Sequence, residues 1–263
     1  MNDFKGPLTT ASTLFNALRE VGLDTGDVVC VHAALSNLGY VCGGARTVVD
    51  TLIELLGPDG TLMMPTYTRD TADPREWQYP PAPPEWLDRL VEETPPYDPL
   101  KSPTQRMGLI SELFRTYPNV RRSGHPVSSV AAHGPQAQFL TEKVGLNNRF
   151  GPESPYGRLT KIGGKILLLG APFETMSLLH LSQYLIGWGT PVQKSACMLV
   201  DGVRQWVKFD DFVFPHDWST DCVQAMVDTG LAVFSGSAKS HILCVDAARA
   251  VEFTLAWRKE HNY

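Results

Sequence analysis

His180 is the residue whose surroundings in the sequence point most directly to chemistry. It follows the aliphatic run Lys165–Leu169, which ends at Gly170 and is typical of a strand buried on both faces. From Thr175 onward the leucines return at helical spacing, so His180 is expected in the first or second turn of a helix. In open α/β sheets, ligands bind beyond the carboxyl ends of the strands. His180 is therefore either a base at such an edge or a structural histidine.

The segments that precede His180 in the chain are expected to form part of a β-sheet. Val28–Val31 and Thr61–Met64 read as buried strands on either side of a periodic helix, Ala45–Leu56. This order predicts a βαβ-type unit with parallel strands. Small residues fill the loop before the helix, and Gly43-Gly44 at its amino end would favour an anion such as a phosphate. The loop lacks a Walker or dinucleotide-binding fingerprint, so it could also be an ordinary connection.

Residues 66–103 differ in composition from the rest of the chain. They combine prolines with carboxylates and with aromatic residues such as Trp77, Trp86 and Tyr97. A connection this long is usually a lid or a binding loop. Carboxylates interleaved with aromatic rings suit a polyhydroxylated polycation, although a solvated, proline-stiffened excursion would have the same composition.

Two later segments also carry signals. Arg121, Arg122 and His125 flank a turn and could clamp phosphates or simply be solvated. The dipeptide Asp201-Gly202 lies between two apolar runs and predicts a β-hairpin. The expected hairpin strands are 196–200 and 205–209, the expected closing helices 222–229 and 242–255, and the possible short strands 232–234 and 241–245.

Composition narrows the function classes. The 263 residues carry a formal net charge of −5 and 43% hydrophobic residues, which describes a globular chain without a basic nucleic-acid patch. No apolar run is long enough to span a membrane, and the first residues lack a signal-peptide core. The five cysteines are scattered without CxxC spacing, so we expect reduced cysteines in a cytoplasmic protein and no zinc site.

Taken in order, several segments resemble the aminoglycoside 3-N-acetyltransferase family, also called antibiotic N-acetyltransferases. The resemblance runs from about residue 12 to about residue 255. The matching segments are Val31–Gly39, Gly43-Gly44-Ala45, Gly57–Thr66, Tyr117–Pro126, Ser154-Pro155, Gly163–Gly170 and Leu179-His180-Leu181.

The resemblance implies a fold and a co-substrate. The fold would be a single α/β domain over residues 1–263, a three-layer α/β/α sandwich with a mostly parallel central sheet and a small antiparallel subregion. Residues 66–103 would be an insert in it. The co-substrate would be acetyl-CoA, with no metal. The residues implied to contact it are His32, Ala33, Ala34, Leu35, Ser36, Gly43, Gly44, Arg122, Ser123 and His125.

The resemblance also implies a mechanism by direct acetyl transfer. His180 would be the general base, assisted by the carboxylate of Asp211, nine residues beyond Gly202. An amine is mostly ammonium at neutral pH, and it must lose a proton before it can attack a thioester. A neutral imidazole can take that proton while a carboxylate stabilises the imidazolium. Backbone N–H groups near Leu35 and Ser36 would stabilise the oxyanion. The residues implied to contact the substrate are Tyr67, Asp70, Asp73 and Gln183.

The chain departs from the family pattern in ways that keep alternatives open. Gln183 stands where a Glu is usual, Val213 replaces a further acid, and Ala33 and Ala34 replace Ser. The main reading is an antibiotic-resistance enzyme that acetylates the 3-amino group of aminoglycosides. The alternatives are an acyltransferase for another amine in biosynthesis and a degenerate CoA-binding relative. The expected partner is a polycationic amine, with no nucleic acid and no membrane, and the expected state is a monomer or homodimer.

Overall fold

The computed structural model describes residues 6–78, 80–147, 149–214, 218–237 and 240–261. The α-helices in these ranges are α1 (Ala11–Glu20), α2 (Gly44–Leu56), α3 (Leu87–Glu93), α4 (Gly108–Phe114), α5 (Ala137–Thr141), α6 (Pro155–Lys161), α7 (Leu179–Leu185), α8 (Ser219–Asp228) and α9 (Ala247–Glu260). The short 3-10 helices are η1 (Leu35–Asn37), η2 (Arg69–Thr71), η3 (Pro74–Glu76), η4 (Pro84–Trp86) and η5 (Phe173–Thr175). The strands are β1 (Leu8–Thr9), β2 (Val28–Ala33), β3 (Tyr40–Val41), β4 (Thr61–Pro65), β5 (Arg121–Arg122), β6 (Val130–His133), β7 (Lys165–Leu169), β8 (Thr190–Val200), β9 (Val203–Val213), β10 (Val233–Gly236) and β11 (His241–Asp246).

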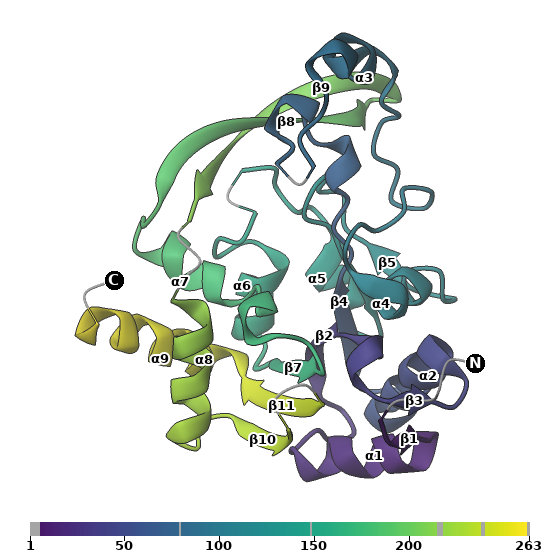
Figure 1. The fold of residues 1–263 in the computed structure, drawn as a ribbon, viewed down its shortest axis with the longest axis vertical. Helices are drawn as coiled ribbons and strands as arrows, with labels where there is room; N and C mark the ends of the chain where they lie inside the picture. The colour runs from purple at the N-terminus through teal and green to yellow at the C-terminus, as the bar shows by residue number, and fades with distance from the viewer. Residues whose placement is uncertain (1–5, 79, 148, 215–217, 238–239, 262–263) are drawn as a thin grey trace.

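A mixed sheet forms the centre of the molecule, with strand order β10-β11-β7-β2-β4-β6-β5 (Figure 1). In the described sheet β2 pairs in parallel with β4 and with β7, and the outer pairings are antiparallel. The prediction of a mostly parallel sheet is therefore wrong outside these three strands. Between β4 and β6 the chain passes through the insert, α4 and β5, and it enters β6 antiparallel to both β4 and β5.

Both faces of the sheet are apolar because side chains alternate along each strand. Ile166 and Leu168 of β7 join one hydrophobic cluster with residues of α5, α6, α8 and α9. Leu167 and Leu169 join another cluster with residues of α1, α2 and α4. Each fully buried leucine contributes roughly 2 kcal/mol of hydrophobic free energy, so β7 is fixed from both sides. The prediction that this run is a strand buried on both faces is confirmed.

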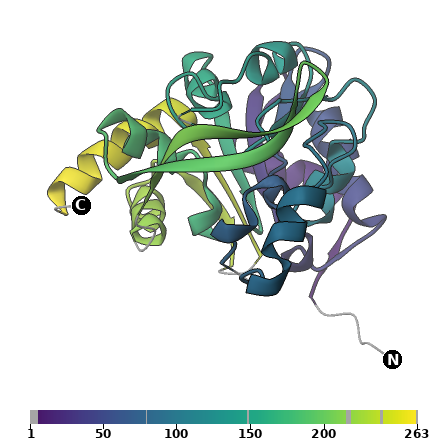
Figure 2. The same cartoon turned by 90° about the horizontal axis from the view of Figure 1, so that it is seen from above.

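A second, two-stranded sheet formed by β8 and β9 extends away from the body, and we call it the hairpin arm. Each strand has 11 residues, so the arm is longer than predicted. Its turn is the predicted one: Asp201 and Gly202 both have positive φ angles, 51° and 78°, as a two-residue hairpin turn requires. The arm crosses over the body in the view from above (Figure 2). Isolated bridges join Ala196 to Ala72 and Met198 to Tyr97 of the insert.

The end of the chain differs from the predicted closing helix 242–255. Residues 241–246 form β11, which pairs with β7, and α9 begins only at Ala247. The Asp246 side chain caps α9 by accepting a hydrogen bond from the backbone N–H of Arg249. The prediction of a helix from residue 242 is therefore wrong, and the alternative, a short strand at 241–245, is confirmed. None of the helices in the described ranges combines the length and apolar character needed to cross a membrane.

Candidate active site

His180 lies at the beginning of α7, beyond the carboxyl end of β7, as the sequence predicted. The ring is partly buried between two aromatic side chains. Its centroid is 4.8 Å from that of Phe150 and 5.5 Å from that of Phe214, which stacks on it at 27°. These two rings hold the imidazole plane in place, which is a requirement for a base of defined direction.

The tautomer of His180 is set by Gln183, one turn further along α7. His180 Nδ1 is 2.6 Å from Gln183 Oε1, and Gln183 is fully buried. An amide oxygen can only accept, so the ring nitrogen facing it carries the proton. In the neutral ring this leaves the lone pair on Nε2. Gln183 therefore orients the imidazole but brings no negative charge.

Asp211 on β9, the carboxylate predicted to assist His180, contacts a tyrosine of α7 and two cationic side chains. Its carboxylate accepts a hydrogen bond from Tyr184 Oη and pairs with Arg149 Nε at 2.9 Å and Lys194 Nζ at 3.4 Å. Tyr184 lies four residues after His180 and so projects from a neighbouring part of the α7 surface. Asp211 is thus connected to His180 through the helix, while Gln183 occupies the Nδ1 position.

Electrostatics keep Asp211 ionised. Burial alone would raise the pKa of its carboxyl, but Arg149, Tyr184 and Lys194 outweigh burial and hold that pKa below its usual value. The same contact acts in the opposite direction on the phenol, because burial and the neighbouring carboxylate both raise the pKa of Tyr184. The result is a charged, hydrogen-bonded link between the hairpin arm and α7.

The predicted substrate residues divide into two groups. Tyr67 lies near His180, because its ring packs edge-on to Phe150, the ring that contacts the imidazole. The Tyr67 hydroxyl lies 2.9 Å from Ser177 Oγ. Burial raises the pKa of Tyr67 to about 12, so it stays a neutral hydrogen-bonding group. Asp70 is an exposed carboxylate on η2. Asp73 instead joins the insert to the arm, since its carboxylate accepts from Ser195 Oγ at 2.9 Å.

The implied acetyl-CoA loop lies at the carboxyl end of β2. His32 is buried, and burial lowers its pKa to about 4, so the ring is neutral. Ala33 ends β2, Ala34 donates its backbone N–H to Leu169, and the loop then forms η1 with Leu35 and Ser36. The sequence prediction that this loop joins a strand to a helix is confirmed.

The amino end of α2 suits an anion. Gly43 is the N-cap residue and Gly44 the first residue of this 13-residue helix, and no side chain caps its free N–H groups. Those N–H groups and the helix dipole favour a phosphate, which is the group that a coenzyme A molecule would present. The observed helix end therefore fits the implied co-substrate.

Arg122, Ser123 and His125 have contacts that favour a structural role over the implied contact with acetyl-CoA. The Arg122 guanidinium donates from Nε, Nη1 and Nη2 to groups on Thr66, Thr68, Pro99, Ser102 and Ser129. Ser123 Oγ accepts from the Val130 backbone. His125 is fully buried, accepts at Nδ1 from two backbone N–H groups, and has Nε2 3.1 Å from the Leu146 carbonyl oxygen. These donors and acceptors already have partners within the chain.

Four residues of the site were missed in the sequence: Arg149, Phe150, Tyr184 and Phe214. Tyr184 could have been found from its i+4 spacing to His180. Arg149 and Phe150 lie in a stretch without periodicity, and Phe214 follows directly after β9. Their approach to His180 depends on tertiary packing that local spacing does not encode.

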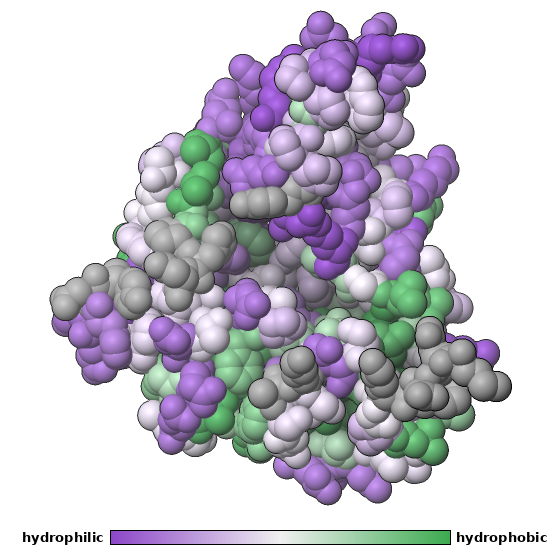
Figure 3. Space-filling view, in the orientation of Figure 1, coloured by the Kyte–Doolittle hydropathy of each residue, from purple (hydrophilic) through white to green (hydrophobic). Residues whose placement is uncertain are grey.

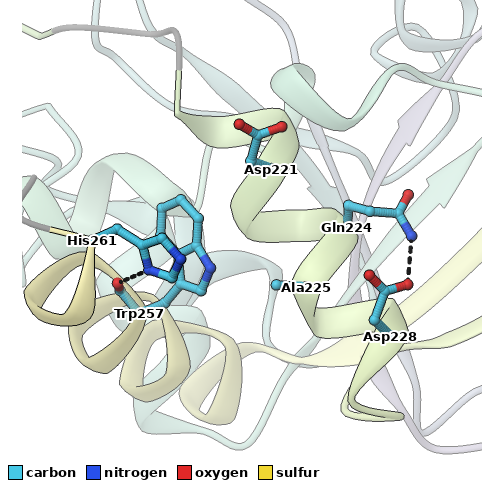
Figure 4. Close-up of a pocket in the computed structure, with 6 residues that line it drawn as sticks. All are labelled: Asp221, Gln224, Ala225, Asp228, Trp257 and His261. Atoms are coloured by element: carbon cyan, nitrogen blue, oxygen red, sulfur yellow. Dashed lines mark hydrogen bonds between the residues drawn. The ribbon is translucent and has the colours of Figure 1, made fainter.

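Two shallow pockets, each of about 370 Å³, lie on the described surface. One lies at the base of the hairpin arm and includes Asn147, Gln193, Asp210 and Asp211. The other lies between α8 and α9 and contains none of the predicted site residues; Trp257, His261 and two aspartates of α8 line it (Figure 4). Figure 3 shows a mostly hydrophilic surface over the upper end of the molecule, where α3 and the tip of the arm lie. Among the described residues, no group of three or more metal-binding side chains is arranged to hold an ion.

The chain is similar to known proteins along most of its length. A model of the family described as aminoglycoside 3-N-acetyltransferase matches residues 30–259. The SPbeta prophage-derived aminoglycoside N(3')-acetyltransferase-like protein YokD of Bacillus subtilis (strain 168) is 35% identical over 251 residues, covering 94% of this chain and 92% of that protein. Aminoglycoside N(3)-acetyltransferase VII of Streptomyces paromomycinus is 35% identical over 277 residues, covering 97% and 93%.

Solved structures agree with these matches. The crystal structure of the YokD protein from Bacillus subtilis has a TM-score of 0.92 at 32% identity, with 98% of this chain and 97% of that chain covered. A structure described as AAC-IIIb binary with CoASH has a TM-score of 0.85 at 28% identity, with 97% and 98% covered.

Proposed function

Because the chain belongs to the aminoglycoside 3-N-acetyltransferase family, we propose that it transfers the acetyl group of acetyl-CoA directly to the 3-amino group of an aminoglycoside, with His180 as general base. The observation that carries this proposal is the contact between His180 Nδ1 and Gln183 Oε1. This hydrogen bond keeps a proton on Nδ1. The lone pair is then on Nε2, the ring nitrogen on the side away from Gln183, where it can accept a proton. We also propose that residues 1–263 form one acetyltransferase domain with the insert at 66–103.

His180 removes a proton from the substrate ammonium, and the imidazole becomes an imidazolium. Phe150 and Phe214 keep the ring in its plane during this step. Gln183 Oε1 continues to accept from Nδ1–H, so the positive ring keeps one hydrogen bond. Asp211 stabilises the charge from a distance and fixes α7 through Tyr184.

Acetyl-CoA, when bound, supplies the acetyl group as a thioester. The residues that would hold it are those of the loop from His32 to Ser36 and the amino end of α2 at Gly43-Gly44. Backbone N–H groups at Leu35 and Ser36 would be the donors to the acetyl oxyanion, and His180 would return its proton to the coenzyme A thiolate that leaves when the C–S bond breaks. Helix α2 supplies its uncapped N–H groups to a phosphate.

Carboxylates of the insert attract the polycationic substrate. Asp70 is exposed near the end of β4, and Glu76 follows on η3. Burial and the nearby carboxylates of Asp73 and Asp211 raise the pKa of Glu76, although Lys194 opposes this shift. Such a concentration of negative charge raises the local concentration of a cationic substrate.

The test is to mix the protein with acetyl-CoA, a thiol reagent and a panel of aminoglycosides and simpler amines. We expect thiol release with several aminoglycosides, and mass spectrometry should locate the acetyl group on the 3-amino nitrogen. Release only with other amines would support the second candidate, an acyltransferase for a different amine. That candidate is favoured by the neutral Gln183 beside the base and by Lys194 next to Asp211. Binding of CoA without thiol release from any amine would contradict both.

A further inference from the structure

Arg258 on α9 is a buried cation with no carboxylate partner among the residues that the structure describes. It is 1% exposed, and Nε, Nη1 and Nη2 make no hydrogen bond in the described structure. Its contacts are instead aromatic: the guanidinium carbon lies 3.7 Å from the Trp188 ring centroid and 5.2 Å from that of Trp218. The cation therefore lies over one indole and near a second.

This arrangement is not explained by stability alone. A buried guanidinium without hydrogen bonds is unfavourable, and an apolar side chain of similar volume would fill the same space without a desolvation penalty. A guanidinium does offer a flat, rigid plane that stacks on aromatic faces, which Lys and Met do not. The position of Arg258 therefore suggests that the orientation of Trp188 matters.

Trp188 occupies the junction between α7 and the hairpin arm. Its backbone N–H donates to the carbonyl of Gln183 at 2.9 Å, so it closes the carboxyl end of the helix that carries His180. It also packs edge-on to Trp218, which begins the segment leading into α8. Trp188 thus joins two elements: its backbone bonds to the last turn of the helix that carries His180, and its indole packs against Trp218 at the start of α8.

A second connection from Trp188 reaches the imidazole itself. The next residue, Gly189, packs so closely against Phe214 that a Cβ there would be 2.8 Å from the Phe214 ring. Phe214 in turn stacks on His180. Trp188 therefore influences His180 by two routes, through Gln183 on one side and through Gly189 and Phe214 on the other.

We propose that Arg258 is a positioning residue for His180, acting through the orientation of Trp188. This inference rests on the proposed function of His180 as the base. Arg258 touches neither the imidazole nor Gln183 in the described structure, so it is not a catalytic residue. It fixes Trp188 and thereby the relative positions of His180 and Gln183.

The test compares Arg258→Met, Arg258→Lys and a matched control, Arg249→Met, which removes an exposed arginine from the same helix. For Arg258→Met we expect kcat to fall about tenfold, because small displacements of a catalytic group have large effects on rate. KM for acetyl-CoA should change less than about twofold, because the α2 site is on the other face of the sheet. The kcat of Arg258→Lys should lie between those of Arg258→Met and the wild type, since lysine keeps the charge but not the flat guanidinium group. The kcat of Arg249→Met should match that of the wild type.

A readout independent of turnover is the ring N–H resonance of His180, measured by ¹⁵N NMR with His180→Gln for assignment. We expect a sharp Nδ1–H signal in the wild type and in Arg249→Met, and a broadened or shifted signal in Arg258→Met. Trp188→Phe, which keeps an aromatic face, should disturb this signal less than Trp188→Leu does. These conservative variants keep the proposal testable if Arg258→Met does not fold.

Two outcomes would overturn the proposal. One is a kcat of Arg258→Met within about twofold of wild type with an unchanged His180 signal. The other is an equal loss of kcat and of CoA affinity in proportion to the folded fraction, which would indicate only general destabilisation. If the wild type acetylates no amine, the proposed function fails, and the His180 signal still decides whether Arg258 positions the ring.

Discussion

His180 and His125 both lie near ends of strands in the central sheet, yet their surroundings differ. His125 is fully buried, both ring nitrogens bond to backbone groups, and burial with the nearby Arg149 lowers its pKa to about 4. His180 is partly exposed between two aromatic rings, and its Nδ1 bonds to a side chain one turn away. The first histidine supports a turn, whereas the second has the accessibility that proton transfer requires.

The difference shows which contacts separate a structural histidine from a candidate base. In His125 the backbone occupies both nitrogens, so the ring cannot exchange a proton without breaking the turn at Val127 and Ser128. In His180 a neutral amide fixes one nitrogen. Their sequence contexts were similar, since both histidines lie close to a Gly, a Ser and an apolar strand.

The strongest test of this comparison is His180→Ala. We expect kcat to fall by roughly 10³-fold, because the general base is lost, while acetyl-CoA binding by calorimetry stays unchanged. Steady-state thiol release would measure the rate. If the variant keeps most of its activity, His180 is not the general base, and the contrast with His125 has no catalytic meaning.

The stability of the protein in acid tests the structural role of the buried histidines. His32 and His125 have folded-state pKa values of about 4, below the roughly 6.5 of an unfolded chain. Their stabilisation is complete above pH 6.5 and is lost as the pH falls toward 4, because the unfolded state then binds more protons. Each contributes on the order of 3 kcal/mol across this range. Urea unfolding at pH 7 and pH 4.5 measures the loss.

His125→Asn should reduce this pH dependence while leaving the rate per folded molecule within about twofold of wild type. His133→Asn, on a partly exposed position of β6, is the matched control. If His125→Asn instead raised KM for acetyl-CoA strongly at unchanged stability, the residue would be a CoA contact, as the family resemblance implied.

Gln183→Glu sharpens the comparison by changing the charge beside His180. A carboxylate at Nδ1 would stabilise the imidazolium, so the acid limb of the kcat/KM profile should move up by about one pH unit. At pH 6 the variant should lose activity up to about tenfold, since more of the base is protonated. A pH–rate profile from pH 5 to 9 is the measurement, and an unmoved acid limb would contradict the assigned contact.

Lys194→Met is expected to have the smallest effect. Lys194 Nζ lies 3.4 Å from Asp211 with a quarter of its side chain exposed, so it repels an incoming ammonium. Its removal should lower KM for a polycationic amine about threefold at low salt and less at high salt. Lys208→Met, an exposed lysine on the same arm, serves as control. An increase in KM would mean that Lys194 assists binding.

Much of the fold could be predicted because it follows local patterns. The aliphatic run before Gly170 became β7, and Asp201-Gly202 became the turn of the arm. Strand direction could not be predicted beyond β2, β4 and β7, because it depends on how the insert returns the chain to β6 and on how the chain after α8 returns to β11. His180 was placed correctly by its position after a core strand.

The surroundings of His180 were less predictable. Counting from the hairpin glycine led to Asp211, but not to the hydrogen bond that Tyr184 of α7 donates to its carboxylate. Arg122 looked like a free phosphate clamp because spacing does not show whether donors are already used. Local sequence thus identified the chemical groups, while their partners depend on contacts between residues far apart in the chain.

The saturated guanidinium of Arg122 has a consequence for redesigning this molecule. It bonds to Thr66, where the insert leaves the body, and to Pro99 and Ser102, where the insert returns. A protein engineer who deletes the intervening excursion to make a smaller catalyst would strand several N–H donors under the sheet edge. Any shortened version should therefore exchange Arg122 for a compact, uncharged residue in the same step.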